Sequence, residues 1–126
     1  MNYTIKNLRD VEDSAPQLGV DERMEARFAR DAMDAVDTGV TLHFIKPGKR
    51  GAAHRHEKAE EVYVVLSGSG SINLDGETHR LEQLDAVRVA PQVRRGFEAG
   101  PEGLELLVFG PHHEGDGERV ADLWSD

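Results

Sequence analysis

The fold is decided by residues 48–68, which read GKRGAAHRHEKAEEVYVVLSG. His54 and His56 are two residues apart, and in an extended chain this spacing places both imidazoles on one face. Glu61 begins the next expected strand and shares its face with Tyr63. Two imidazoles and one carboxylate suit a divalent first-row metal and leave positions open for water or substrate. A short His-x-His pattern also occurs in solvated loops, so spacing alone leaves an exposed loop as the alternative.

The chain beyond residue 39 has the pattern of successive β-strands. Residues 40–45 alternate in character, with His43 on the same face as Thr41 and Ile45. Residues 61–68 are apolar on both faces, as expected of a central strand. Further turns and strands are expected at Asp75-Gly76, 86–91 and 104–110. The turn signals recur about every 8–12 residues, which is typical of an all-β antiparallel sandwich or barrel.

The two ends of the chain are less regular. Tyr3 to Ile5 could form a short strand, and the polar residues 9–22 predict a loop. Residues 23–34 fit two patterns, because apolar residues alternate there but also recur at helical spacing. The tail after Pro111 is polar apart from a few residues, and Trp124 is expected to fold back over the barrel. We expect one domain over 1–126, with a barrel core at about 23–110.

Composition excludes several classes of function. The chain has 126 residues and a formal net charge of −9, which argues against a nucleic-acid or anionic-membrane surface. No apolar run has the length of a membrane span, and the first residues lack the apolar core of a signal peptide. We therefore expect a cytoplasmic protein. Cysteine is absent, which excludes disulfides and thiol chemistry.

The quoted stretch resembles the first motif of the cupin family. Gly48, His54, His56, Glu61 and Gly68 match that motif in every fixed position, and the likeness extends more loosely over about 23–110. The chain is similar to small single-domain bacterial cupins, and the resemblance implies a double-stranded β-helix, the jelly-roll barrel. It favours a strand over a helix for 24–30. It also implies that the two histidines and the glutamate are metal ligands.

The second cupin motif is degenerate in this chain. Aligning residues 84–100 places Arg95 where the family has a fourth, histidine ligand, or Arg94 if the loop slips by one. Arginine stays protonated and offers only donors, so it does not ligate a metal. Either Zn, Mn, Fe or Ni binds through the remaining three ligands and Arg95 favours an anionic ligand, or no metal binds and Arg95 pairs with Glu61.

These alternatives lead to different functions. The resemblance implies a metal-dependent enzyme such as a dioxygenase or isomerase, in which Arg95 fixes an anionic group and Tyr63 or His43 shuttles a proton. His43 and Tyr63 are also explained as ordinary buried packing residues. A second hypothesis is a module that binds a small anionic metabolite without turnover, and a third is a structural partner without a ligand. We expect a small-molecule ligand and a homodimer, since a small sheet leaves an uncovered edge.

Overall fold

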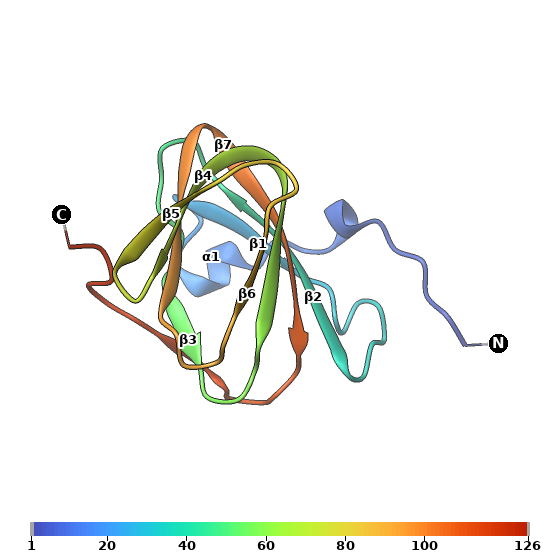
Figure 1. The fold of residues 1–126 in the computed structure, drawn as a ribbon. Coiled ribbons are helices and arrows are strands. Elements are labelled where there is room, and N and C mark those ends of the chain that lie inside the picture. The colour runs from blue at the N-terminus through green and yellow to red at the C-terminus, as the bar shows by residue number, and fades with distance from the viewer. Residues whose placement is uncertain (1, 126) are drawn as a thin grey trace.

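A computed structural model describes residues 2–125, and every strand pair within them is antiparallel (Figure 1). The elements in chain order are η1 (Leu8–Asp10), α1 (Ala15–Leu18), β1 (Met24–Phe28), β2 (Thr38–Ile45), β3 (His54–His56), β4 (Glu61–Leu74), β5 (Glu77–Leu81), β6 (Ala86–Val89), β7 (Arg95–Pro111) and β8 (Gly117–Arg119). The predicted all-β jelly-roll barrel is confirmed. No helix within residues 2–125 has the length and apolar character needed to cross a bilayer.

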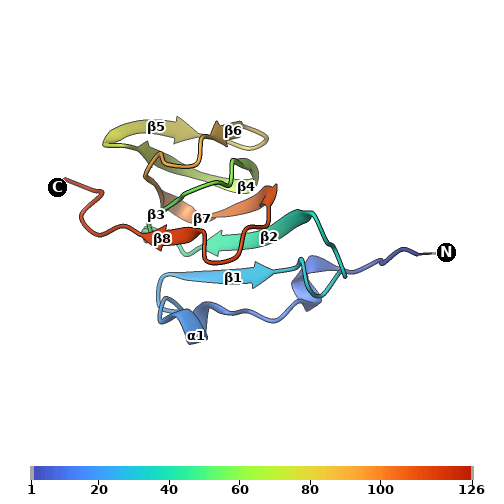
Figure 2. The same cartoon turned by 90° about the horizontal axis from the view of Figure 1, so that it is seen from below.

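Two long strands, β4 and β7, run through both halves of the barrel. In one half, residues 104–109 of β7 pair with the start of β4, and β2, β1 and β6 complete the layer. In the other half, residues 95–99 of β7 pair with the end of β4, and β5, β3 and β8 flank them. Figures 1 and 2 show the sheet curling on itself around these two strands. The sequence predicted several short strands where the structure has the two long strands β4 and β7.

The bend in β4 depends on glycine. The pairing of β4 with β7 shifts register between Val65 and Ser67 and again between Gly68 and Gly70. Gly68 has a φ of 75°, and a Cβ there would overlap the carbonyl oxygen of Gly103. A side chain is therefore excluded both by the left-handed backbone and by the close approach of β7. Gly68 is also a fixed position of the motif found in the sequence.

The apolar core fills the interior of the barrel. Its members come from the inward positions of β1, β2, β4 and β7, and they include Ile45, Tyr63, Val65, Ile72, Leu104 and Leu106, all at most 2% exposed. Alternation along each strand places these residues on one face, as the sequence pattern predicted. The core leaves one end of the interior to polar side chains, and that end holds the candidate site.

The two ends of the chain differ from expectation in part. Met24–Phe28 is a strand paired with β2, which confirms the strand reading over the helical one. Tyr3 to Ile5 form no strand, and their side chains are largely exposed, so that prediction was wrong. These residues have strand-forming character but no neighbouring strand with which to pair. The expected loop at 9–22 contains the short helices η1 and α1.

The C-terminal segment folds back on the barrel and adds a strand that the sequence did not predict. All three residues of β8 pair with β3. Beyond it, Val120 donates a backbone hydrogen bond to Ala53. The indole of Trp124 lies under the guanidinium of Arg50, with 4.4 Å between the guanidinium carbon and the ring centroid. The segment thus covers the strand that carries two of the candidate metal ligands.

Candidate metal centre

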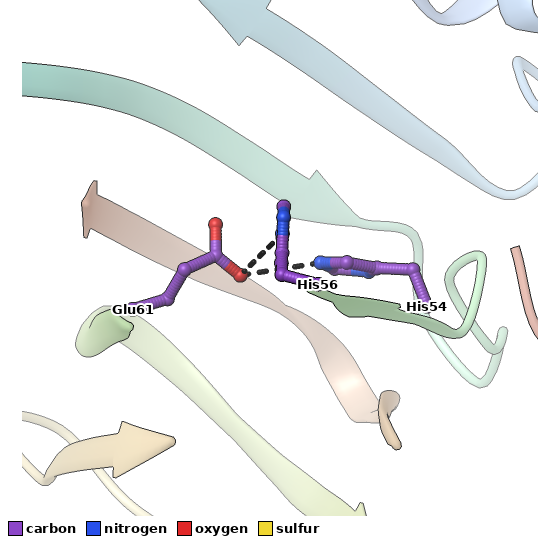
Figure 3. Close-up of side chains that lie close together, drawn as sticks. All are labelled: His54, His56 and Glu61. Carbon is purple, nitrogen blue, oxygen red and sulfur yellow. Dashed lines mark hydrogen bonds and ion pairs between the residues drawn. The ribbon is translucent and has the colours of Figure 1, made fainter. Parts of the chain in front are cut away.

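Two neighbouring strand ends supply the three candidate ligands. His54 and His56 alternate along β3 with Arg55, so both imidazoles point inward and the arginine points outward. Glu61 is the first residue of β4, and only residues 57–60 separate it from His56. Figure 3 shows both rings directed at the same carboxylate oxygen. The rings are nearly perpendicular, with centroids 5.0 Å apart.

The distances fit a single divalent ion. Oε1 of Glu61 lies 3.2 Å from Nε2 of His54 and 3.2 Å from Nε2 of His56. One ligand atom from each residue can be chosen so that all three lie within 4.8 Å of one another. Bonds of about 2.0–2.2 Å to one metal place its ligands roughly 3–4 Å apart. Nε2 of His56 is buried, and its contact with Oε1 of Glu61 lacks hydrogen-bond geometry, so it has no hydrogen-bond partner among the described residues and a metal would satisfy it.

Glu61 is held as a carboxylate. Burial alone would raise its pKa, but hydrogen bonds with His54 and Tyr63 and the close contact with His56 outweigh burial and lower the pKa well below its usual range. The carboxylate of Glu61, 3.2 Å from Nε2 of His56, in turn raises the pKa of His56, against the opposing effect of burial. Glu61 therefore carries a negative charge at neutral pH, which is the form of a carboxylate that binds a metal.

Tyr63 belongs to the same cluster. Its hydroxyl donates to Oε1 of Glu61 at 2.5 Å and lies 3.4 Å from Nε2 of His54. Burial, together with the charge of Glu61, raises the pKa of Tyr63 well above its ordinary value, so the phenol keeps its proton at neutral pH. Its ring packs against Phe97, with centroids 4.9 Å apart. Tyr63 therefore joins the apolar core to the polar end of the interior.

His43 lines the same cavity from β2. Its Nε2 is buried and has no hydrogen-bond partner among the described residues. Burial, with a smaller contribution from the charge of His54, lowers the pKa of His43 to about 4. The ring is therefore neutral at pH 7, and one of its nitrogens is free to accept a hydrogen bond from a ligand.

Arg95, which the sequence aligned with the fourth ligand of the family, lies opposite His54, and its guanidinium donates to backbone carbonyl groups. The two residues are register partners between β3 and β7. Arg95 is completely buried, and it donates to the carbonyl oxygens of Ala90 and Pro91 at 3.2 and 3.0 Å. Its Nε lies 3.9 Å from Oε1 of Glu61. Arg94 points outward to Asp75, which excludes the slipped alignment.

A cavity of about 330 Å³ adjoins the three candidate ligands. Most of its wall is apolar, and the polar groups at its inner end are His43, Tyr63 and the three candidate ligands. Arg95 is not among the residues that line it, although the sequence led us to expect contact with a ligand. A second hollow, of about 350 Å³, shares His56 and Glu61 and opens beside His112 and His113.

Sequence reasoning missed Asp116. Its Oδ2 lies 3.0 Å from Nδ1 of His56, and its carboxylate accepts backbone hydrogen bonds from Lys58 at 2.8 Å and Ala59 at 3.0 Å. It therefore orients one candidate ligand and the loop that leads to the next. Sixty residues separate Asp116 from His56 in the chain, and the acidic tail around it gives no pattern that singles out this carboxylate.

Comparisons with known proteins agree with the barrel fold. Among curated proteins, dimethylsulfoniopropionate lyase DddW of Ruegeria pomeroyi is 38% identical over 60 residues, which cover 48% of this chain and 39% of that enzyme. The polyketide cyclase RemF from Streptomyces resistomycificus has a similar structure, with a TM-score of 0.77 and 21% identity over 96% of this chain and 86% of that one. A cupin protein from Bacteroides fragilis has a TM-score of 0.70 and 22% identity over 91% of this chain and 87% of that one.

The match to DddW spans less than half of either protein, and at such low identity the structural likenesses show the fold alone. The family itself is shown by a separate match. The family model described as "Cupin domain" matches residues 41–110, which hold the three candidate ligands and both long strands almost entirely. This match covers more than half of the chain and agrees with the antiparallel barrel, so the chain belongs to the cupin domain family.

Proposed function

We propose that this cupin holds one divalent transition-metal ion through His54, His56 and Glu61 and binds a small anionic metabolite in the adjoining cavity. The observation that carries the proposal is the convergence of three donor groups at the polar end of a cavity of about 330 Å³. Nε2 of His56 supports it further, because this buried atom has no hydrogen-bond partner among the described residues. Zn, Mn, Fe and Ni all suit the donor set.

The surrounding residues support an enzyme of the dioxygenase or isomerase type. A divalent ion in such a site polarises a carbonyl group or offers a position for O₂. Tyr63 keeps its proton and donates it to Oε1 of Glu61, so it orients that candidate ligand, and its hydroxyl oxygen is left to accept a hydrogen bond from a bound molecule. His43 is neutral and lines the cavity, so it is suited to accept a proton or a hydrogen bond.

The charges near the site support an anionic ligand. Arg95 lies behind Glu61, with 3.9 Å between Nε and Oε1, so its positive charge offsets that carboxylate. By simple addition, a divalent ion, Glu61 and Arg95 leave a local charge of about +2. Arg95 acts here through its field, because its guanidinium donates to backbone carbonyls rather than into the cavity.

The contact between Arg95 and Glu61 also bears on the alternative function, a barrel without a metal. Without a metal, Arg95 serves as the cation that pairs with Glu61, and the barrel is a metal-free module that binds a small molecule without turnover. The distance of 3.9 Å is long for a strong ion pair, and Nε of Arg95 has no hydrogen-bond partner among the described residues. The metal-binding function is therefore the better supported of the two.

Metal titration tests the proposal. The chelator-treated full chain is titrated calorimetrically with Zn²⁺, Mn²⁺, Fe²⁺ and Ni²⁺, alongside the variants Glu61→Gln and Glu60→Gln. Glu60 is the matched control, because it is adjacent in sequence but exposed and paired with Arg88 at 3.1 Å. We expect one bound equivalent in the wild type and in Glu60→Gln, and at least about tenfold weaker binding in Glu61→Gln. A wild type that binds none of the four ions contradicts the proposal.

Turnover separates the enzyme from the binding module. The metal-loaded chain is incubated with a panel of keto acids, thiols and sugar phosphates, and products are followed by mass spectrometry. Turnover that is lost in His56→Ala supports the enzyme. Binding without turnover that persists after chelation supports the metal-free module.

A further inference from the structure

We propose that Arg119, in the C-terminal strand β8, recognises an anionic group of the ligand at the mouth of the cavity. The inference rests on the proposed function, because it assumes that the ligand occupies the cavity beside the three metal ligands. It assigns to Arg119 the contact that the sequence suggested for Arg95. It also makes the C-terminal segment part of the binding site.

The strand register places Arg119 on the same side of the sheet as the metal ligands. His54 is the register partner of Arg95 on β7 and of Arg119 on β8. Directly opposed residues on neighbouring strands point to the same face, with Cβ atoms roughly 5 Å apart. The next residues along, Arg55 and Glu118, also oppose each other and pair on the outer face, with 3.4 Å between Nε and Oε2. β8 lies beside β3 in Figure 2.

A second contact holds the guanidinium over the cavity. Nη2 of Arg119 donates to the carbonyl oxygen of Leu18 at 2.9 Å. Leu18 ends α1, and both residues line the cavity, so the side chain reaches from β8 to α1 at its edge. A guanidinium has five N–H donors, and this contact uses one of them. No carboxylate within residues 2–125 forms an ion pair with Arg119, so its charge is available to a ligand.

No other cationic side chain of the described residues fills this role. Arg119 is the one arginine or lysine among the residues that line the cavity. Arg95 is completely buried and donates to backbone carbonyls. Arg23 and Arg50 line a neighbouring hollow, of about 510 Å³, that Arg119 also borders. Glu118 also lines the cavity but pairs with Arg55, so in a chain with a net charge of −9 Arg119 is the cation at this cavity that attracts an anion.

The cavity wall indicates the class of ligand. The apolar part of the wall includes Val20, Met24, Ile45 and Phe97. The cavity thus offers three regions: the metal ligands, an apolar wall and Arg119. A ligand that fits them has an oxygen-rich head at the metal ligands, a short aliphatic body and a second anionic group at Arg119. We therefore infer a short-chain diacid as the ligand class. Arginine suits this role because its planar fork binds a carboxylate through two hydrogen bonds.

The test compares two acids that differ at one end. 2-Oxoglutarate and 2-oxopentanoate share the same oxygen-rich head and chain length, but one ends in a carboxylate and the other in a methyl group. Their affinities are measured calorimetrically for the wild type, Arg119→Gln and Arg55→Gln, in Zn²⁺-loaded and chelator-treated forms. Arg55→Gln is the matched control, because it removes the same charge from the outer face of the adjacent strand.

We expect the wild type and Arg55→Gln to prefer the diacid by about tenfold or more, the effect of one charge-assisted contact. In Arg119→Gln the preference falls to near unity while the affinity for 2-oxopentanoate is unchanged. If Arg119 had only a structural role, its replacement would weaken the binding of both acids equally. If Arg119→Gln does not fold, Arg119→Lys replaces it, and we expect it to keep only part of the preference.

Three results would overturn the inference: a wild type without preference, a preference that survives in Arg119→Gln, or no binding of either acid to either form. Failure of the proposed metal site is seen separately, because the Zn²⁺ titration reports on it directly. If Zn²⁺ does not bind, the ratio of the two affinities in the chelator-treated protein still tests the role of Arg119.

Discussion

At the scale of the residue, Asp116 fixes which ring nitrogen of His56 faces the site. Nδ1 donates to Oδ2 of Asp116 at 3.0 Å, so the lone pair of Nε2 is left for a metal. Metal-bound histidines commonly donate their second N–H to a carboxylate in this way. Asp116 also accepts hydrogen bonds from Lys58 and Ala59, in the loop between two ligands. One carboxylate therefore positions both a ring and a loop.

We predict that Asp116→Asn lowers the affinity for Zn²⁺ by about tenfold or more, since the hydrogen bond that orients His56 loses its charged acceptor. Isothermal titration calorimetry measures the change. Glu118→Gln is the control, because Glu118 lies two residues away and faces Arg55 on the outer surface. Equal affinities in the two variants would show that Asp116 does not orient the site.

His43 predicts a pH dependence of stability. Its pKa is about 4 in the folded chain and about 6.5 when unfolded. Between these values the unfolded chain takes up a proton that the folded chain excludes. The contribution of His43 to stability is therefore full above pH 6.5 and is lost as the pH falls toward 4. Because His43 as a whole keeps partial exposure although its Nε2 is buried, we expect an effect on the order of 2 kcal/mol in total.

Urea unfolding of the chelator-treated chain between pH 6.5 and 5 checks this dependence. His43→Gln is expected to flatten the fall in the free energy of unfolding, while His79→Gln, which changes an exposed ring, leaves it as in the wild type. The window avoids the range in which Asp13 and Asp75 titrate, because their pKa values lie below 3.8. A slope that is identical in His43→Gln and the wild type would contradict the prediction.

At the scale of the element, the curvature of β4 depends on Gly68. We predict that Gly68→Ala lowers the free energy of unfolding by about 3 kcal/mol, because the new Cβ meets the Gly103 carbonyl and the backbone is left-handed. Gly76→Ala is the control: it also has a positive φ, but nothing lies within 4 Å of its Cβ position. We expect it to cost about 1 kcal/mol. If urea unfolding finds that the two variants lose equal free energy of unfolding, the contact between position 68 and the Gly103 carbonyl is not what makes Gly68 necessary.

Local pattern predicted the strands that carry the site. Alternation placed His43 on the face of Thr41 and Ile45, which the structure turns toward the cavity, and the spacing of His54, His56 and Glu61 placed three donors together. Both features depend on residues close in the chain. Alternation could not show that β4 and β7 are each continuous, because their bulges interrupt the period of two.

Contacts between segments that are distant in the chain could not be predicted from the sequence. Asp116 and Arg119 reach the site only because β8 pairs with β3, about sixty residues away in the chain. β8 has three exposed residues, GER, with no apolar alternation to mark a strand. The direction of the Arg95 guanidinium was equally hidden, since it depends on the carbonyl groups of Ala90 and Pro91. The residue type determines which groups a side chain can bind, but the surrounding backbone determines the direction in which the side chain points.

At the scale of the whole molecule, the N-terminal segment projects away from the barrel (Figures 1 and 2). Tyr3 and Ile5 are 69% and 88% exposed, and within residues 2–125 the edge strand β1 pairs with β2 alone. We propose that these features join two copies as a homodimer, since an apolar arm and an open edge are both available.

Light scattering coupled to size exclusion measures the assembly over a range of concentrations. We predict a dimer mass for the wild type and a shift toward monomer in Ile5→Ser, because the variant removes apolar contact area from the arm. Lys6→Gln, the neighbouring exposed position, serves as the control and is expected to remain dimeric. A monomer mass at every concentration would rule the dimer out.

The short length of β3 has a consequence for how an ion enters. β3 carries two of the three ligands, yet it meets β7 at a single register position and otherwise pairs with the three residues of β8. Its amides should therefore exchange with solvent faster than those of β4 and β7, because so few hydrogen bonds must open. Loading then needs only fraying at this edge, not unfolding of the barrel. A bound ion would hold β3 in place through His54 and His56, so slower amide hydrogen exchange in β3 is the expected sign of an occupied site.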